Sequence, residues 1–118
     1  MAGLEVKEKD QDTYRKYRIL AYTAGQYRAY QNLVNQKIYD MALDSLISTI
    51  GRCEEYSSDA KELGCEGEIS DIQAKAEEAL EAFKIDTEKA LEVYDMKDRT
   101  AYSKEIYQIL DDAGLSEE

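Results

Sequence analysis

Two short acidic runs, EEALE and EVYD, have a spacing that suits metal binding. Within each run two carboxylates stand three positions apart, and residues three apart share one face of a helix. Carboxylate oxygens are the ligands that Mg²⁺ takes in proteins, and a bound Mg²⁺ can carry the phosphate groups of a substrate. The candidate magnesium ligands are Glu78, Glu81, Glu92 and Asp95.

This double ExxE and ExxD pattern resembles the carboxylate motif of the MazG-type all-α nucleotide pyrophosphatases. Those enzymes hold magnesium between carboxylates on two helices, and the metal carries the triphosphate. The resemblance covers only the segment 77–95. It implies a magnesium-dependent nucleotide hydrolase in which the same four carboxylates bind the metal.

The acidic runs also have a simpler interpretation. On one continuous helix, their carboxylates would lie opposite an apolar stripe that includes Ile72, Phe83 and Tyr94. They would then form a solvated face, with Asp95 and Arg99 at the i,i+4 spacing of a stabilising pair. We therefore expect no catalytic residues and no cofactor, and keep the magnesium enzyme as an alternative.

The chain contains no histidine, which limits the chemistry open to it. Ser-His-Asp and Cys-His nucleophile pairs are excluded, and so are zinc sites that need imidazole. The two cysteines, Cys53 and Cys65, are too few for a disulfide framework and lack the CxxC spacing. We expect two free thiols, and a disulfide between them stays open.

Charge is strongly segregated along the sequence. The chain has a formal net charge of −11, yet residues 13–39 hold five basic residues and no acid. The first helical segment places arginine and tyrosine on one side, and this patch could bind phosphate or an acidic protein surface. Nucleic acid is an unlikely ligand for so acidic a chain. The candidate partner-binding residues are Tyr14, Arg15, Arg18 and Tyr22.

A second interpretation of the basic segment is internal. Residues 40–118 hold 22 acidic and 8 basic residues, a sum of −14, so the first helix could neutralise the acidic helices around it. Its tyrosines would then be core residues with hydroxyls at the rim. We favour this interpretation over an external ligand. The expected core stripe of the first helix is Tyr17, Leu20, Ala24, Tyr27, Tyr30 and Val34.

Apolar residues at steps of three and four predict an all-α fold. We expect a first helix over about 12–34, capped by Asp10 or Asp12, and a second over about 38–63, with a turn at 35–37. Gly64 is a natural C-cap, 64–68 a loop, and Ser70 with Gln73 a capping box for the third helix. A further break is expected at either Asp86 or Asp98, and the last helix ends near Ala113 and Gly114.

The fold expected from these elements is a single domain over residues 1–118, either a four-helix bundle or two stacked helical hairpins. Residues 1–10 and 115–118 are expected to be disordered. The chain begins with a hydrophilic segment and has no apolar run of membrane-spanning length, so we expect a cytoplasmic protein.

The function that these features favour is a non-catalytic, acidic, helical domain for protein interaction or oligomerisation. The chain has ten tyrosines, more than a small helical core hides, and tyrosine supplies large, stiff contact surfaces. The expected partner is another protein or a second copy, most simply in a homo-oligomer. Two alternatives remain: the magnesium-dependent nucleotide pyrophosphatase, and an acidic mimic of nucleic acid that occupies a basic target.

Overall fold

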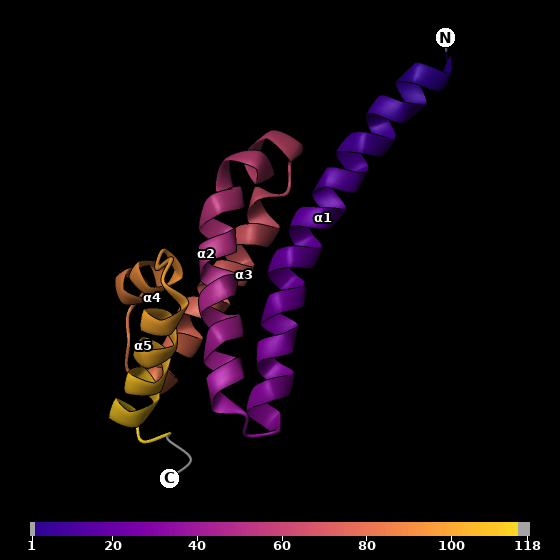
Figure 1. Ribbon diagram of the computed structural model, residues 1–118. Helices are drawn as coiled ribbons and strands as arrows, with labels where there is room; N and C mark the ends of the chain where they lie inside the picture. The colour runs from indigo at the N-terminus through magenta and orange to yellow at the C-terminus, as the bar shows by residue number, and fades with distance from the viewer. Residues whose placement is uncertain (1, 116–118) are drawn as a thin grey trace.

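The computed structural model describes residues 2–115, and all regular structure in that part of the chain is helical. Five α-helices and one 3-10 helix, η1, are present there (Figure 1). The predicted all-α class is therefore confirmed, whereas the predicted count of four helices is not. The elements are α1 Ala2–Asn35, α2 Tyr39–Leu63, α3 Glu66–Ala79, η1 Leu80–Phe83, α4 Thr87–Tyr94 and α5 Arg99–Asp112.

A tight turn reverses the chain between α1 and α2, where the sequence predicted it. Lys37 adopts a left-handed conformation with φ of 62°. Its N–H donates to the carbonyl of Val34 at 2.9 Å, and the N–H of Ile38 donates to the carbonyl of Leu33 at 2.9 Å. These bonds satisfy carbonyl groups that a helix end otherwise leaves free. As a result α1 and α2 lie antiparallel, side by side (Figure 1).

The start of α1 differs from the prediction. We expected residues 1–10 to be disordered and a helix to begin near Thr13, whereas α1 begins at Ala2. The predicted caps Asp10 and Asp12 therefore lie inside the helix. Residues 4–12 contain neither glycine nor proline and are rich in Glu, Lys and Gln, which favour helix. No local signal stops the helix there, so it continues past the ends of α2 and α3 (Figure 1).

Gly64 ends α2 as predicted, with φ of 76°. The N–H of Cys65 donates to the carbonyl of Ala60 at 2.8 Å and that of Gly64 to Lys61 at 3.3 Å, the bonding of a Schellman motif. This compact reversal lets α3 begin at Glu66. The predicted loop 64–68 is therefore too long, and the capping box is wrong because Ser70 lies within α3.

The chain breaks at both of the aspartates between which the sequence left a choice. The carboxylate of Asp86 accepts a bond from the N–H of Lys89 at 2.8 Å and caps α4. The carboxylate of Asp98 accepts from the N–H groups of Thr100 at 2.9 Å and Ala101 at 3.3 Å and caps α5. Asn and Asp side chains stabilise helix starts in this way. Each aspartate starts its own helix, which explains the fifth one.

The core divides into two clusters along the length of α2. The larger joins α2 to α3, η1, α4 and α5, and also takes Tyr30 from α1. The smaller lies where α1, α2 and the start of α3 meet. Burial of apolar surface in both supplies most of the stabilisation. The buried residues of the smaller cluster are Ile19, Cys53, Ala60, Cys65 and Ile69.

The molecule is elongated, with extents of 63 × 28 × 20 Å. The first part of α1 projects from one end, while α4 and α5 pack beside the first half of α2 near the other (Figure 1). Within residues 2–115, no helix combines the length and the apolar character that a bilayer crossing demands.

Candidate protein-interaction surface

Three of the predicted partner-binding residues, Tyr14, Arg15 and Arg18, lie on the projecting part of α1. We call this part, residues 2–18, the arm. The described side chains of the arm, residues 11–18, are all exposed except that of Lys16, which is half-buried. Tyr14 is 64% exposed and Tyr17 is 74% exposed. At 100° per residue, both lie about 140° or more around the helix from the buried Ile19, so they point away from α2 and α3. The arm therefore offers tyrosine and arginine side chains on a helix with open sides.

The exposure of Tyr17 corrects the predicted core stripe of the first helix. The face of α1 turned toward α2 and α3 is instead centred on Ile19, Thr23 and Tyr30, all buried. The hydroxyl of Thr23 donates to the carbonyl of Ile19 at 2.9 Å, so its polar atom is satisfied within the helix. The predicted stripe therefore shared Tyr30 with this face but omitted Ile19 and Thr23.

Tyr22 forms the join between the arm and the body. It is 38% exposed, and its ring stacks on that of Tyr56 in α2 with centroids 6.5 Å apart. The guanidinium carbons of Arg18 and Arg52 lie 5.5 Å and 5.1 Å from the centre of the Tyr22 ring. Such cation–π contacts stabilise by about 0.5–1 kcal/mol at exposed sites. Tyr22 therefore holds α1 against α2 more than it offers a free surface.

In residues 11–115, the ion pairing of the basic residues of α1 stays within that helix. In the described part of the chain, the ion pair of Arg15 is with Asp12 of the same helix, at 3.8 Å. No ion pair there connects α1 to another helix. From the sequence we favoured the interpretation that α1 neutralises the acidic helices directly. No contact among these residues supports it. Both arginines of the arm are exposed, so an external partner can still reach them.

The four candidate magnesium ligands are distributed over separate elements. Glu78 is on α3, Glu81 on η1, Glu92 on α4 and Asp95 directly after α4, and all four are exposed. Glu92 faces a cation instead, with its carboxylate 3.9 Å from the ammonium of Lys89. Among the side chains of residues 11–115, no three acidic or cysteine groups lie so as to hold a metal ion. The magnesium alternative gains no support from this arrangement.

A second surface, which the sequence analysis missed, is a groove between the start of α2 and α5. It consists of two adjoining hollows of about 1170 Å³ and 470 Å³, and we call it the α2–α5 groove. Met41 and Tyr107 line it and are 55% and 59% exposed. The tripeptide YDM occurs at 39–41 and again at 94–96, and both copies contribute to its wall. That repeat was the available signal in the sequence.

Hydrogen bonds fix the inner wall of the α2–α5 groove. The hydroxyl of Tyr102 in α5 donates a short bond to the carboxylate of Asp44 in α2. The hydroxyl of Tyr94 in α4 donates to the carboxylate of Glu55 at 2.9 Å. Burial and these carboxylates raise the pKa of both phenols, that of Tyr94 to about 12. Both tyrosines therefore stay protonated and keep donating at neutral pH.

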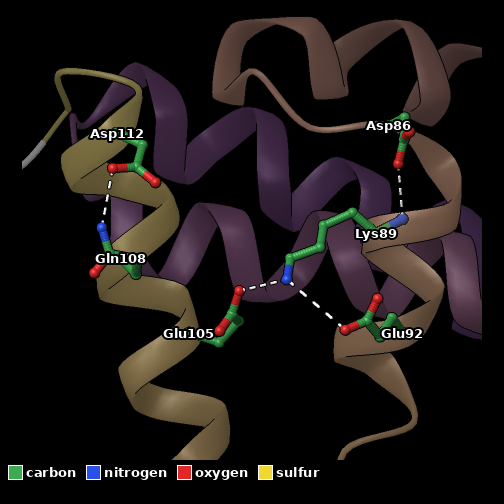
Figure 2. A network of polar contacts seen from close by, with 6 residues as sticks. All are labelled: Asp86, Lys89, Glu92, Glu105, Gln108 and Asp112. Atoms are coloured by element: carbon green, nitrogen blue, oxygen red, sulfur yellow. Dashed lines mark hydrogen bonds and ion pairs between the residues drawn. The ribbon is translucent and has the colours of Figure 1, made fainter.

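A further contact holds α4 against α5 (Figure 2). The ammonium of Lys89 lies 2.6 Å from the carboxylate of Glu105, and this bond raises the pKa of the lysine. Gln108 donates to Asp112 one turn later on α5, at 2.9 Å. The helices that form the groove are thus held together by hydrogen bonds and an ion pair.

Comparison with known proteins gives this chain no relative: no protein-family model, no curated protein and no solved structure matches it.

Proposed function

We propose that this protein is a non-catalytic helical interaction module that associates with an acidic protein surface, first of all that of a second copy. The observation that carries the proposal is the arm. Two tyrosines, each more than half exposed, stand there beside three basic residues, on a chain whose remainder is acidic. Large exposed aromatic side chains with arginine are enriched at the centres of protein interfaces.

Electrostatics supports self-association through this segment. Residues 13–18 carry +3 from Arg15, Lys16 and Arg18, whereas residues 40–118 sum to −14. Opposite fields steer association and are weakened by salt, because the screening length is about 8 Å at physiological ionic strength. A second copy is thus an electrostatically suitable partner.

Sedimentation velocity over a wide concentration range tests the proposal. The wild type should sediment faster as its concentration rises, and Tyr14→Ser/Tyr17→Ser should remain monomeric. Because both side chains are exposed, this variant should keep the helical circular dichroism and the melting temperature of the wild type. Arg28→Gln, an exposed change on α1 below the arm, is the control and should associate as the wild type does.

A wild type that stays monomeric at every concentration would contradict self-association, and equal association of the double tyrosine variant would remove the arm from it. A cytoplasmic location and the acidic mimic of nucleic acid stay predictions from the sequence. The magnesium-dependent pyrophosphatase is likewise a prediction, tested by adding Mg²⁺ and nucleoside triphosphates and assaying release of pyrophosphate.

A further inference from the structure

We infer that the arm of one copy docks in the α2–α5 groove of the next copy, so that molecules associate head to tail. This inference rests on the proposed self-association and names its two surfaces. Both surfaces expose large side chains that nothing in their own molecule covers, Tyr14 and Tyr17 on the arm and Met41 and Tyr107 in the groove.

The shape of the molecule makes the contact intermolecular. The arm and the groove lie toward opposite ends of a molecule 63 Å long (Figure 1). Because α1 is a single unbroken helix of 34 residues, the arm cannot fold back to reach the groove below it. A contact between two different surfaces is heterologous, and it leaves one free arm and one free groove on every dimer.

The apolar parts of the two surfaces suit each other. Tyrosines bring rigid, flat contact area that loses little conformational entropy when it is fixed. The groove offers Met41 and Met96, whose flexible side chains adapt to the shape of an incoming group. An amphipathic helix seated in a groove of this kind is a common mode of recognition.

The charges of the arm match those of α5 in one orientation. Residues 1–12 sum to −2, and residues 13–18 to +3. Along α5, which forms one wall of the groove, the order is reversed: Lys97, Arg99 and Lys104 lie before or in its first half, and Asp111 with Asp112 lie at its end. Asp40 and Asp44 of α2 line the other wall. An arm that runs parallel to α5 places acidic beside basic at both ends. The antiparallel orientation places like charges together, so we expect the parallel one.

The spacing of the charges is consistent with this orientation. On the arm, about ten residues separate the middle of the acidic segment from the basic one, or roughly 15 Å at 1.5 Å per residue. On α5, about eleven residues separate the middle of the basic cluster from the two aspartates, or roughly 17 Å. Both charge pairs can therefore form with the helices in one register.

A complementation experiment tests the inference. One variant loses the arm, Tyr14→Ser/Tyr17→Ser, and the other has a filled groove, Ser103→Arg. Ser103 is exposed and lines both hollows, so arginine there occupies the groove without disturbing the core. Each variant alone should be monomeric. Their equimolar mixture has one intact arm and one intact groove, so it should form a dimer and nothing larger.

The wild type, with both surfaces intact, should grow beyond the dimer as its concentration rises. Ser70→Arg, an exposed serine on α3, is the matched control and should associate like the wild type. If Ser103→Arg loses its helical circular dichroism, Met41→Glu blocks the groove instead at another exposed position. The groove variants should weaken self-association by about tenfold or more.

The outcomes separate this inference from the proposed function. If the groove variants associate normally while the arm variant does not, the arm binds elsewhere, for example to a second arm. The inference then fails and the proposed function stands. A mixture that remains monomeric while the wild type associates also overturns it. A wild type without self-association overturns both.

Discussion

Tyrosines at the two ends of this molecule have different surroundings. Toward the C-terminal end, Tyr94 and Tyr102 donate hydrogen bonds to Glu55 and Asp44 and so connect α4 and α5 to α2. On the arm, Tyr14 and Tyr17 are more than half exposed. Tyrosine thus forms hydrogen bonds between helices at one end of the molecule and is exposed to solvent at the other.

The difference depends on whether the helix face that carries the tyrosine is turned toward a second helix. Tyrosine has an apolar body and a polar tip, so it suits a packed interface and a wet surface equally well. Sequence spacing places it on a helical face but does not say whether that face is covered. Substitutions that compare the contacts of α4 and α5 with those of α1 follow, beginning with the largest expected effect.

The largest effect is expected where α4 touches α2. The ring of Tyr94 packs directly on Gly51, and a Cβ atom at position 51 would overlap the ring. Gly51→Ala should therefore lower the free energy of unfolding by about 1–3 kcal/mol through overpacking, although alanine is the better helix former by about 1 kcal/mol. Chemical denaturation with urea measures the change.

Gly25→Ala is the matched substitution on α1. No atom lies within 4 Å of the Cβ that it would add. Only helix propensity then acts, and the variant should gain about 0.5–1 kcal/mol. Equal effects of the two substitutions would show that Tyr94 does not pack on α2 as described.

Removing the hydroxyl of a tied tyrosine should have a smaller effect. Tyr102→Phe removes the bond to Asp44 and should lower the free energy of unfolding by about 1 kcal/mol. Tyr107→Phe, at an exposed position of the same helix, should change it by less than about 0.5 kcal/mol. Thermal melts of the two variants, each against the wild type, give the comparison.

The tied tyrosines also predict an alkaline weakness. Burial and then the bond to Glu55 raise the pKa of Tyr94 to about 12, while an unfolded tyrosine titrates near 10. The unfolded chain loses this proton first, so the contribution is complete below pH 10 and declines between pH 10 and 12. Urea midpoints across this window should fall less in Tyr94→Phe than in the wild type. Parallel curves for the two proteins would count against the raised pKa.

The smallest effect concerns ion pairs. Lys89→Gln breaks the contact between α4 and α5 (Figure 2), and Arg15→Gln breaks a contact within α1. Partly exposed pairs contribute about 0.2–1 kcal/mol. We expect the Lys89 variant to lie near the upper limit and the Arg15 variant near zero, with both differences reduced by 0.5 M salt. A larger loss for Arg15→Gln would restore the internal interpretation of the basic segment.

Much of the fold could be predicted from local signals. The turn at 35–37 and the C-cap at Gly64 are confirmed because each depends on a few neighbouring residues. Asp86 and Asp98 were expected as alternative sites of a helix break, and both start a helix. The two sites are not alternatives, because each aspartate accepts bonds from the N–H groups of its own helix and neither cap excludes the other.

The surfaces were harder to predict, because exposure depends on which face of a helix is turned toward its neighbours. Tyr17 continues the predicted apolar stripe of α1 at steps of three and four, yet it lies about 160° around the helix from the buried Ile19 and faces away from α2 and α3. The α2–α5 groove brings together residues more than fifty positions apart, such as Met41 and Tyr107. No spacing rule within one helix reports such a juxtaposition.

The smaller core cluster provides a kinetic reporter. Cys53 and Cys65 are free and buried beside Ile19 of α1, and burial raises the pKa of Cys53 to about 12. Only the thiolate reacts with alkylating reagents, so the raised pKa protects Cys53 at neutral pH, and burial keeps reagents from both cysteines while α1 is in place. The rate of alkylation therefore measures how often α1 detaches from its neighbours, a local opening that equilibrium melting does not resolve.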